Sequence, residues 1–223
     1  MVCYTEIIRT VLHGGHSIEA GSDYGYANTG DRRKAVLWSK EPWVYPDMSG
    51  DPMMPSGRFI SGVAGGIRFV GVCIPWKDAH VRSGRRDRAP WEDHVSYCEA
   101  LGRILDRYSK APEPICILGD FNQRIPRLTQ PDRVAKALTT ALTGGFTVPT
   151  EGMIDQEGRG LIDHFAVSND LIVSAINILD RFAPDGTRLS DHVGVAATIE
   201  TKKENNKGCC EWVSDSESIR LRP

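Results

Sequence analysis

The sequence predicts a single mixed α/β domain, and three observations support this fold class. Short runs rich in β-branched and aromatic residues recur along most of the chain, as in a protein with many strands. Two longer segments instead carry apolar residues at helical spacing. The 223 residues are 40% hydrophobic and 25% charged, which is ordinary for a soluble globular protein with a substantial core. With no internal repeat or clear linker, we expect one domain over residues 1–200 and a polar, aperiodic tail over 201–223.

The first half of the chain is expected to be mainly β-structure. Its predicted strands span residues 2–8, 33–39, 58–64 and 67–74. Gly65 and Gly66 lie between the last two runs, and two consecutive glycines are typical of a tight β-hairpin. These two strands are therefore expected to pair with each other.

The second half alternates helices and strands. A helix is predicted over 91–108, where Val95, Cys98 and Leu101 begin an apolar series at helical spacing. The run 114–118 is short and apolar on both faces, as in a central buried strand. A second helix is predicted over 131–143, with a proline in its first turn and two glycines after its end. Strands are expected over 161–167, 171–179 and 193–200.

Charge and cysteine usage exclude several classes of protein. The net charge of −2 gives no general attraction to nucleic acid, so binding of a polyanion would need a local basic patch. No apolar run is long enough to span a bilayer, and the N-terminus lacks a signal-peptide pattern. The cysteines are scattered through predicted strands and a helix, which is typical of reduced core residues. We expect a cytoplasmic protein with no membrane partner.

Acidic residues occur at unusual places in the predicted strands. The stretch 115–127 reads ICILGDFNQRIPR, so Asp120 and Asn122 directly follow a buried strand. Taken alone, they would be assigned to a turn, which Asp and Asn both favour. Similar acids, however, recur in the pairs Asp163-His164 and Asp191-His192 and at Glu6. Because buried carboxylates are costly unless they are paired or bound to a metal, the pattern suggests a hard-cation site with histidine acid–base chemistry.

The motifs GDFN, IDH and SDH, in this order and after a strand that carries Glu6, resemble the endonuclease/exonuclease/phosphatase superfamily. That superfamily includes deoxyribonuclease I, exonuclease III-type abasic endonucleases, sphingomyelinases and inositol-phosphate phosphatases. The resemblance covers about residues 3–198. It implies a deoxyribonuclease I-like fold, a sandwich of two β-sheets flanked by helices, in which the strand before Asp120 ends at the mouth between the sheets.

The resemblance also implies roles for individual residues. Glu6 would bind Mg²⁺, with Mn²⁺ as a substitute, and Asp191 would lie near the same or a second metal position. His192, oriented by Asp163, would hydrogen-bond the scissile phosphate or transfer a proton. Asp120 would position or deprotonate the attacking water. Asn122 would help to hold the phosphate. At this point either Asp120 or His192 can be the general base.

Two departures from the family pattern concern the site. Family members usually begin with an earlier strand that carries an asparagine, and here Met1 lies directly before the Glu6 strand, so that strand is expected to be absent. A histidine often ends the strand that corresponds to 67–74, where this chain has Cys73, with His80 further along. Without the first strand, the chain is expected to be weakly active, to self-associate, or to depend on a segment supplied from elsewhere.

The substrate is predicted from arginines. Arg124 and Arg127 follow the GDFN motif, and a second group consists of Arg82, Arg85, Arg86 and Arg88. Each group is either a solvated loop or, beside a phosphodiester-cleaving site, a track for a nucleic-acid backbone. We therefore expect a nucleic-acid phosphodiesterase, an endonuclease or exonuclease. The alternatives are an esterase for a small or lipid phosphate, and a non-catalytic binding module derived from the fold.

Other notable side chains are expected to be structural. His94 is predicted to be a capping or surface residue at the start of a helix. His16 is expected in a loop, and His164 is expected to point away from its neighbour Asp163. Trp76 is expected to be a core or rim residue.

Overall fold

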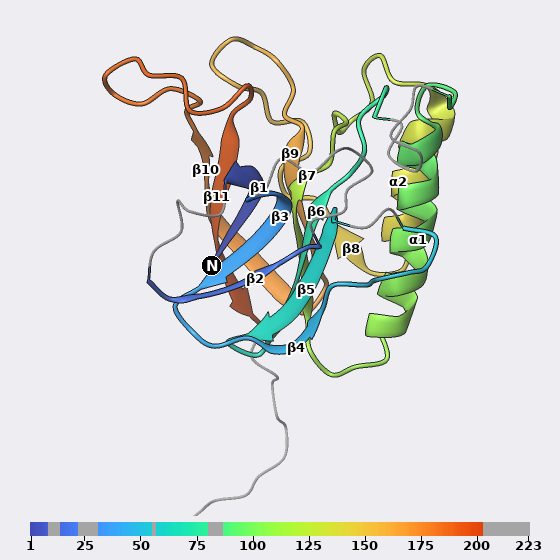
Figure 1. Cartoon of the computed structure of the whole chain (residues 1–223), viewed down its shortest axis with the longest axis vertical. Coiled ribbons are helices and arrows are strands. Elements are labelled where there is room, and N and C mark those ends of the chain that lie inside the picture. Colours follow the sequence, from blue (N-terminus) through green and yellow to red (C-terminus); the bar gives the residue numbers. More distant parts are fainter. Residues whose placement is uncertain (9–13, 22–30, 55–56, 80–86, 203–223) are drawn as a thin grey trace, which may run out of the picture.

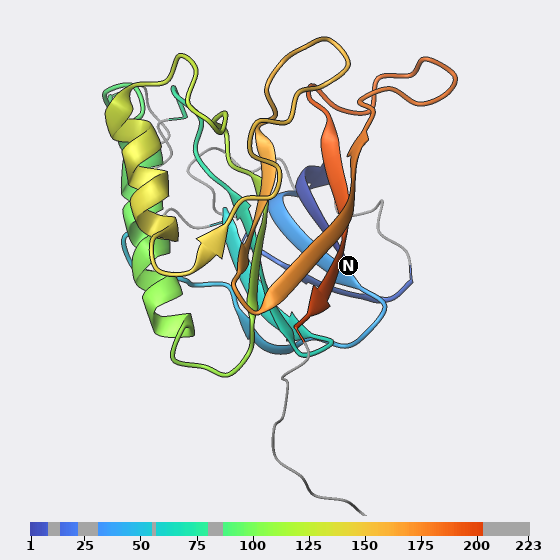
Figure 2. The same ribbon diagram turned by 180° about the vertical axis from the view of Figure 1, so that it is seen from behind.

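The fold is a sandwich of β-layers with helices on one outer face. The computed structural model describes residues 1–8, 14–21, 31–54, 57–79 and 87–202. A six-stranded sheet forms the central layer, and α1 and α2 pack on one of its faces (Figures 1 and 2). The remaining strands form a second layer against the opposite face. The expected two-layer α/β sandwich is therefore confirmed, with both helices on the same side.

The central sheet has the strand order β4-β5-β6-β7-β9-β8. Its strands are β4 (Val44–Asp47), β5 (Phe59–Ala64), β6 (Ile67–Cys73), β7 (Ile115–Asp120), β9 (Asp163–Ser168) and β8 (Phe146–Thr147). Gly65 and Gly66 both have positive φ and join β5 to β6 in the predicted hairpin. The strands β6 and β7 are parallel, so they end at the same edge of the sheet. This edge carries Asp120.

Helices α1 (Glu92–Tyr108) and α2 (Asp132–Leu142) form where the apolar spacing predicts them. Leu101 and Ile104 of α1 are fully buried, as are Val72 and Ile117 on the facing surface of the sheet. Each fully buried aliphatic side chain of this size contributes about 1.5–3 kcal/mol to stability. The packed helices thus fix the central strands in place. The residues at the ends of these strands keep their positions as a result.

The second layer consists of two separate sheets. One has the order β1-β3-β2 and is made of β1 (Val2–Ile8), β3 (Arg32–Ser39) and β2 (His16–Glu19). The other pairs β10 (Leu171–Leu179) with β11 (Gly194–Thr201). Leu37 and Ile60 pack with Phe69 and Phe165 in the core between the two layers. In the described part of the chain no strand pairing joins β1 to β11, so the layer is divided.

Three short strands were not predicted from the sequence. β2 and β4 have four residues each and β8 has two, too few to show a clear alternation. His16 begins β2, so its assignment to a loop is wrong.

The tail beyond residue 202 lies outside the described residues, as do His80, Arg82, Arg85 and Arg86. The cysteines of the described part, Cys3, Cys73, Cys98 and Cys116, are free thiols, as expected. Neither α1 nor α2 is long and apolar enough to cross a membrane.

Candidate active site

The site is built on the end of β7, where the chain changes from apolar residues to Gly119 and Asp120. Gly119 has φ +132°, and a Cβ atom at this position would lie 2.2 Å from the carbonyl oxygen of Val72. Only glycine fits, so the close approach of β7 to β6 requires it. Asp120, the last residue of β7, is 5% exposed and is paired in register with Asp163, the first residue of β9. Two carboxylates therefore face each other at the end of the sheet.

Asn122 holds the Asp120 carboxylate in place. Its backbone N–H donates to Asp120 Oδ1 (2.8 Å). Its Nδ2 donates to Asp120 Oδ2 (2.6 Å) and to the carbonyl oxygen of Ile74 (2.9 Å). Asn122 has φ +52°, a left-handed conformation that Asn adopts more readily than most residues. Since both hydrogens of its amide are used within the protein, Asn122 orients Asp120 in this conformation.

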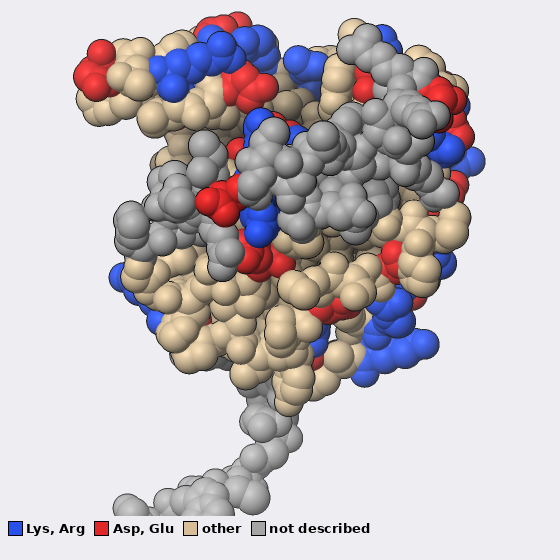
Figure 3. All heavy atoms as spheres, in the orientation of Figure 1, with Lys and Arg blue, Asp and Glu red and all other residues tan. Residues whose placement is uncertain are grey.

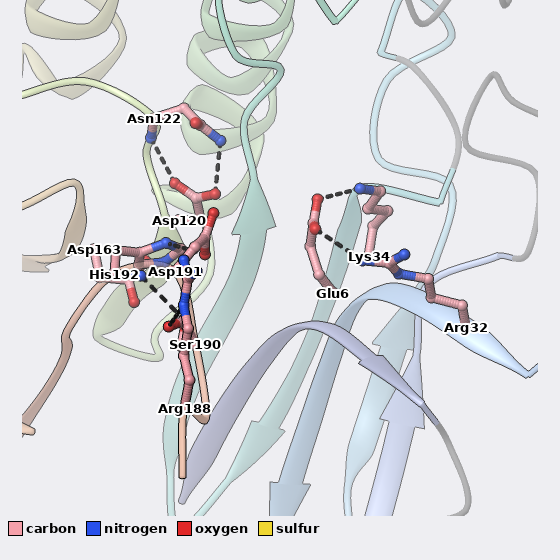
Figure 4. A network of polar contacts seen from close by, with 10 residues as sticks. All are labelled: Glu6, Arg32, Lys34, Asp120, Asn122, Asp163, Arg188, Ser190, Asp191 and His192. Atoms are coloured by element: carbon pink, nitrogen blue, oxygen red, sulfur yellow. Dashed lines mark hydrogen bonds and ion pairs between the residues drawn. The ribbon is translucent and has the colours of Figure 1, made fainter. Parts of the chain in front are cut away.

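His192 comes from a different part of the chain and contacts Asp163 and Asp191 (Figure 4). Its Nε2 donates to Asp163 Oδ1 (3.2 Å), and its Nδ1 lies 2.9 Å from Asp191 Oδ1. The hydrogen bond with Asp163, with the negative charges of Asp163, Asp120 and Asp191, raises the pKa of His192 to about 9. At neutral pH the imidazole is therefore a cation with both nitrogens protonated.

Asp120 has the opposite character. Its burial, together with the neighbouring Asp163 carboxylate, raises the pKa of Asp120 well above the ordinary range of an aspartate. The charge of His192 opposes this effect without cancelling it. Such a carboxylate accepts a proton more readily than an exposed one. The site thus places a carboxylate of raised pKa close to a protonated imidazolium.

Neither predicted metal ligand, Glu6 or Asp191, belongs to the group of described residues whose side chains come close enough to share a metal ion. Asp120, Asp163 and His192 have ligand atoms within 4.8 Å of one another, close enough to hold a metal ion. Glu6 is not in this group and instead forms ion pairs with Lys34 and Arg32 (Figure 4). Partial burial acts to raise the pKa of Glu6, but the hydrogen bond from Lys34 and the two positive charges lower it overall.

The donor set nevertheless fits a hard cation such as Mg²⁺. The Glu6 and Asp191 side chains are 44% and 78% exposed and line one cleft with Asp120 and Asn122. Mg²⁺ keeps several of its waters and needs only one or two carboxylates from a protein. A cation at Glu6 would compete with Lys34 for the same carboxylate.

The cleft has a volume of about 710 Å³ and includes residues that the sequence did not indicate. Trp76, which was expected to be a core or rim residue, is 50% exposed on its wall. It follows β6, which ends at the same edge as β7, and this shared edge is the signal that could have identified it. Arg188 lies three residues before Asp191 and donates from Nε to the carbonyl oxygen of Ser190 (3.0 Å). The other lining residues are Thr5, Arg32, Ile162, Leu189 and Ser190.

The two arginines after the GDFN motif lie in different places. Arg124 lines a small adjoining cavity of about 150 Å³ together with Asp191 and His192. Arg127 lines a separate groove beside α2, pairs with Asp132 (3.1 Å) and donates to the carbonyl oxygen of Gln130. Of these two arginines, Arg124 is therefore the one near the acidic cluster. Of the second predicted arginine group, Arg88 alone is described, and it pairs with Glu92 and Asp93 at the start of α1.

The face of the molecule shown in Figure 3 is not uniformly basic. On the face in Figure 3, blue and red atoms alternate over the connection between β10 and β11 and around the centre. This mixture is consistent with the net charge of −2. Long-range attraction of a polyanion would therefore depend on the few arginines near the cleft.

Cys73 occupies the position at which a histidine was expected. It ends β6 in register with Asp120 and is 1% exposed. Burial, with a smaller contribution from Asp120, raises the pKa of the Cys73 thiol to about 12, so the thiol stays protonated. The buried Arg58 guanidinium lies beside it, with Nη1 3.4 Å from the Cys73 carbonyl oxygen.

His94 is a buried residue next to the site, so its assignment as a capping or surface residue is wrong. Its side chain is 0% exposed. The ring donates from Nδ1 to the carbonyl oxygen of Pro75 (2.7 Å), and Gln123 Nε2 donates to His94 Nε2 (3.1 Å). Burial lowers the pKa of His94 to about 4. His94 thus connects the segments that carry Trp76 and Asn122. His164 is buried against Thr150 and the Leu161 carbonyl oxygen, as expected for a structural residue.

The chain matches no family model, and no characterised protein matches it by sequence. Its fold, by contrast, is found in solved structures. A 3′ phosphatase from Neisseria, bound to a product DNA hairpin, superposes with a TM-score of 0.63 at 16% identity, over 83% of this chain and 79% of that one. An AP endonuclease from Archaeoglobus fulgidus gives 0.63 at 14% identity, over 89% and 88%.

A mannosyl-6-phosphatase from Bacteroides thetaiotaomicron gives a TM-score of 0.54 at 15% identity, over 86% of this chain and 79% of that one. An endonuclease/exonuclease/phosphatase from Beutenbergia cavernae is also similar in fold. At this level of identity, the comparisons concern the fold. They confirm the resemblance to the endonuclease/exonuclease/phosphatase superfamily in the arrangement of the chain.

Proposed function

We propose that this chain, which has the fold of the endonuclease/exonuclease/phosphatase superfamily, is a Mg²⁺-dependent phosphodiesterase that hydrolyses nucleic acid. The observation that carries the proposal is the cluster of Asp120, Asn122, Asp163 and His192 at one end of the cleft. It combines a proton acceptor, a proton donor and the residues that orient them. Phosphoryl transfer to water needs these groups.

In this proposal Asp120 is the general base and His192 is the acid. Asp120 has a raised pKa, lines the cleft and has both of its oxygens held by Asn122, so it removes a proton from the attacking water. His192, kept protonated by Asp163, donates a hydrogen bond or a proton to the phosphate from Nδ1, in place of its contact with Asp191, when Asp191 binds the metal. Asp163 sets the orientation of the imidazole, as an aspartate does in a catalytic triad.

Glu6 and Asp191 would hold the metal ion in the same cleft. A bound Mg²⁺ supplies stabilisation of negative charge on the phosphoryl oxygens and the leaving group. Arg124 and Arg188 would bind phosphate oxygens next to the reacting one, since guanidinium groups suit phosphate. Trp76 offers an exposed ring on which a base can stack.

A second candidate is hydrolysis of a small or lipid phosphate ester. It is favoured by the placement of Arg127 and Arg88, both of which pair with carboxylates away from the cleft. Among the described residues the basic track is therefore short, and a cleft of about 710 Å³ could accommodate a small ester. One of the structural neighbours is itself a sugar-phosphate phosphatase.

A substrate panel tests the proposal. The protein is incubated with single- and double-stranded DNA, RNA, p-nitrophenyl phosphate and bis-p-nitrophenyl phosphate, with Mg²⁺ and with excess chelator. We expect cleavage of nucleic acid and of the diester that requires the metal and is lost in Asp120→Asn. Hydrolysis of the monoester alone would favour the second candidate. No hydrolysis of any substrate, with binding retained, would indicate a non-catalytic module.

A further inference from the structure

Trp76 differs from the other tryptophans in the described part of the chain. Trp38 and Trp43 donate their indole N–H groups to backbone carbonyl oxygens, and the ring of Trp91 packs against the ring of His94. The Trp76 side chain is instead 50% exposed on the wall of the cleft, and its indole N–H has no partner among the described residues. A large aromatic ring that is half exposed beside reacting groups is available to a ligand.

The backbone that carries Trp76 is held on both sides. Before it, the Pro75 carbonyl oxygen accepts a hydrogen bond from the buried His94 ring (2.7 Å). After it, the N–H of Ala79 donates to the carbonyl oxygen of Trp76 (3.1 Å). This segment is therefore in place before a ligand arrives, which lowers the entropy that binding costs.

Trp76 is also close to the reacting groups. Asn122 Nδ2 donates both to Asp120 Oδ2 (2.6 Å) and to the carbonyl oxygen of Ile74 (2.9 Å) (Figure 4). Trp76 lies two residues beyond Ile74, and two residues of extended chain span at most about 7 Å. A nucleotide whose phosphate lies at Asp120 therefore has its base within reach of the Trp76 ring.

The rest of the cleft suits a flat base beside a phosphate. Its other apolar lining residues are Ile162 and Leu189, and Leu189 is 67% exposed. Arg188, the neighbour of Leu189, lines the same cleft and supplies positive charge. Apolar surface for a ring and polar groups for a phosphate thus occur together in a volume of about 710 Å³, which is in the range of small-ligand sites.

Stacking on Trp76 requires an unpaired base. In a duplex both faces of a base are covered by its neighbours, so the base has to leave the stack before an aromatic side chain can contact its face. A duplex would also bring a second strand to the protein. Arg88 and Arg127 pair with carboxylates away from the cleft, so neither offers a free guanidinium group to that strand.

We propose that Trp76 makes the cleft specific for single-stranded nucleic acid by stacking on one unpaired base. The phosphate of that nucleotide lies at Asp120 and His192, and Leu189 adds apolar contact in the same cleft. The inference rests on the proposed function, from which it takes the reacting phosphate, and it adds the class of nucleic acid. A duplex binds through an end or a mismatch that supplies an unpaired base.

The test measures binding to the Asp120→Asn variant, in which hydrolysis is expected to be slow. Three fluorescent DNA ligands of equal length are compared by polarisation at one salt concentration. They are a single strand, the same strand in a blunt duplex, and a single strand in which abasic sites replace the bases. We expect the normal single strand to bind about tenfold or more tightly than the other two, because it alone offers both phosphates and unpaired bases.

Substitutions of Trp76 in the same background locate the contact. Trp76→Ala should weaken binding of the normal single strand roughly 5- to 150-fold, the equivalent of about 1–3 kcal/mol for one stacked base, and should remove most of the preference over the abasic strand. Trp76→Phe keeps a ring and should keep most of the affinity. Tyr45→Ala removes a ring that is 70% exposed on the edge strand β4, and this matched control should bind like the parent.

Intrinsic fluorescence supplies a second readout. A base that stacks on Trp76 should quench its emission, so the normal single strand should quench the parent protein more than the abasic strand does. In Trp76→Phe this difference should be lost although binding is retained. A merely structural role of Trp76 would not produce this combination.

The inference is overturned if the duplex or the abasic strand binds as tightly as the normal single strand. An unchanged affinity in Trp76→Ala, or no binding of any of the three ligands, would also overturn it. Because binding is measured without turnover, this failure is distinct from that of the proposed function. A single strand that binds through Trp76 but is not cleaved by the wild-type protein with Mg²⁺ would refute the proposed function alone, and cleavage without a preference for unpaired bases would refute this inference alone.

Discussion

Asp163 and His192 are 29 residues apart in the sequence, and a hydrogen bond of 3.2 Å joins Asp163 Oδ1 to His192 Nε2. Asp163 is also the cross-strand partner of Asp120. The pKa values of Asp120 and His192 therefore depend on each other and on Asp163, and the three side chains are expected to act as one unit.

The first prediction concerns this unit. Asp120→Asn and His192→Ala should each lower kcat about 10²–10⁴-fold, the range for general acid–base catalysis. The double variant should be little worse than either single one, because residues that act together give non-additive losses. Steady-state kinetics on one phosphodiester measure all three. His16→Ala, an exposed histidine on β2, is the matched control and should keep its activity. Losses that multiply in the double variant would contradict a shared site.

A second prediction concerns the competition between Lys34 and a metal ion for Glu6. An exposed ion pair contributes about 0.2–1 kcal/mol, so Lys34→Met should raise the affinity for Mg²⁺ up to about fivefold. Glu6→Gln should change it in the opposite direction. Titration calorimetry with Mn²⁺ or Mg²⁺ measures both effects. Lys40→Met, at the other end of β3, is the control lysine. An unchanged affinity in both Lys34→Met and Glu6→Gln would remove Glu6 from the metal site.

The third prediction is that Arg124 and Arg127 differ in their effect on the binding of nucleic acid. Arg124 borders the cavity beside His192, whereas Arg127 pairs with Asp132 in another groove. Arg124→Ala should therefore weaken binding of nucleic acid and lower the slope of log K against log salt concentration by roughly 0.7–0.9, the value for one lost phosphate contact. Arg127→Ala should leave the slope unchanged. Equal slopes for the two variants would show that the position beside His192 has no special role.

The fourth prediction concerns stability at acidic pH. His94 is fully buried between Pro75, Gln123 and the edge of the Trp91 ring, and its pKa is lowered to about 4 in the folded protein. The unfolded chain therefore binds a proton to this histidine at a higher pH than the folded chain does. The contribution of His94 to stability is complete above about pH 6.5 and is lost as the pH falls toward 4, by roughly 3 kcal/mol in total.

Urea unfolding at pH 7 and pH 5 tests this prediction. His94→Asn keeps a donor for the Pro75 carbonyl oxygen but cannot be protonated, so its stability should depend less on pH than that of the wild type. His164, whose pKa is also lowered by burial, remains in both proteins and contributes the same slope. If the two proteins lose the same stability between pH 7 and pH 5, His94 is not the group responsible.

Much of the fold follows from local sequence pattern. The β-branched and aromatic run at 2–8, the glycine pair at 65–66 and the helical spacing after Trp91 each identified an element that the structure contains. These signals are local because side-chain periodicity reflects the geometry of a single strand or helix. The short strands β2 and β4 were missed because a strand of four residues forms only beside a longer strand, and its own sequence does not show that partner.

The sequence indicated candidate residues for the site but not how they are arranged. The sequence indicated Asp120, Asn122, Asp163 and His192 because acids at strand ends are costly unless they have a function. Tertiary structure alone decided that Asn122 orients Asp120, that Glu6 pairs with Lys34, and that Arg127 lies away from the cleft. It also raised the pKa of Asp120 and kept His192 protonated, since burial and neighbouring charges set these properties. The contacts of Glu6 with Lys34 and of His192 with Asp163 join residues far apart in the chain, and no local pattern encodes them.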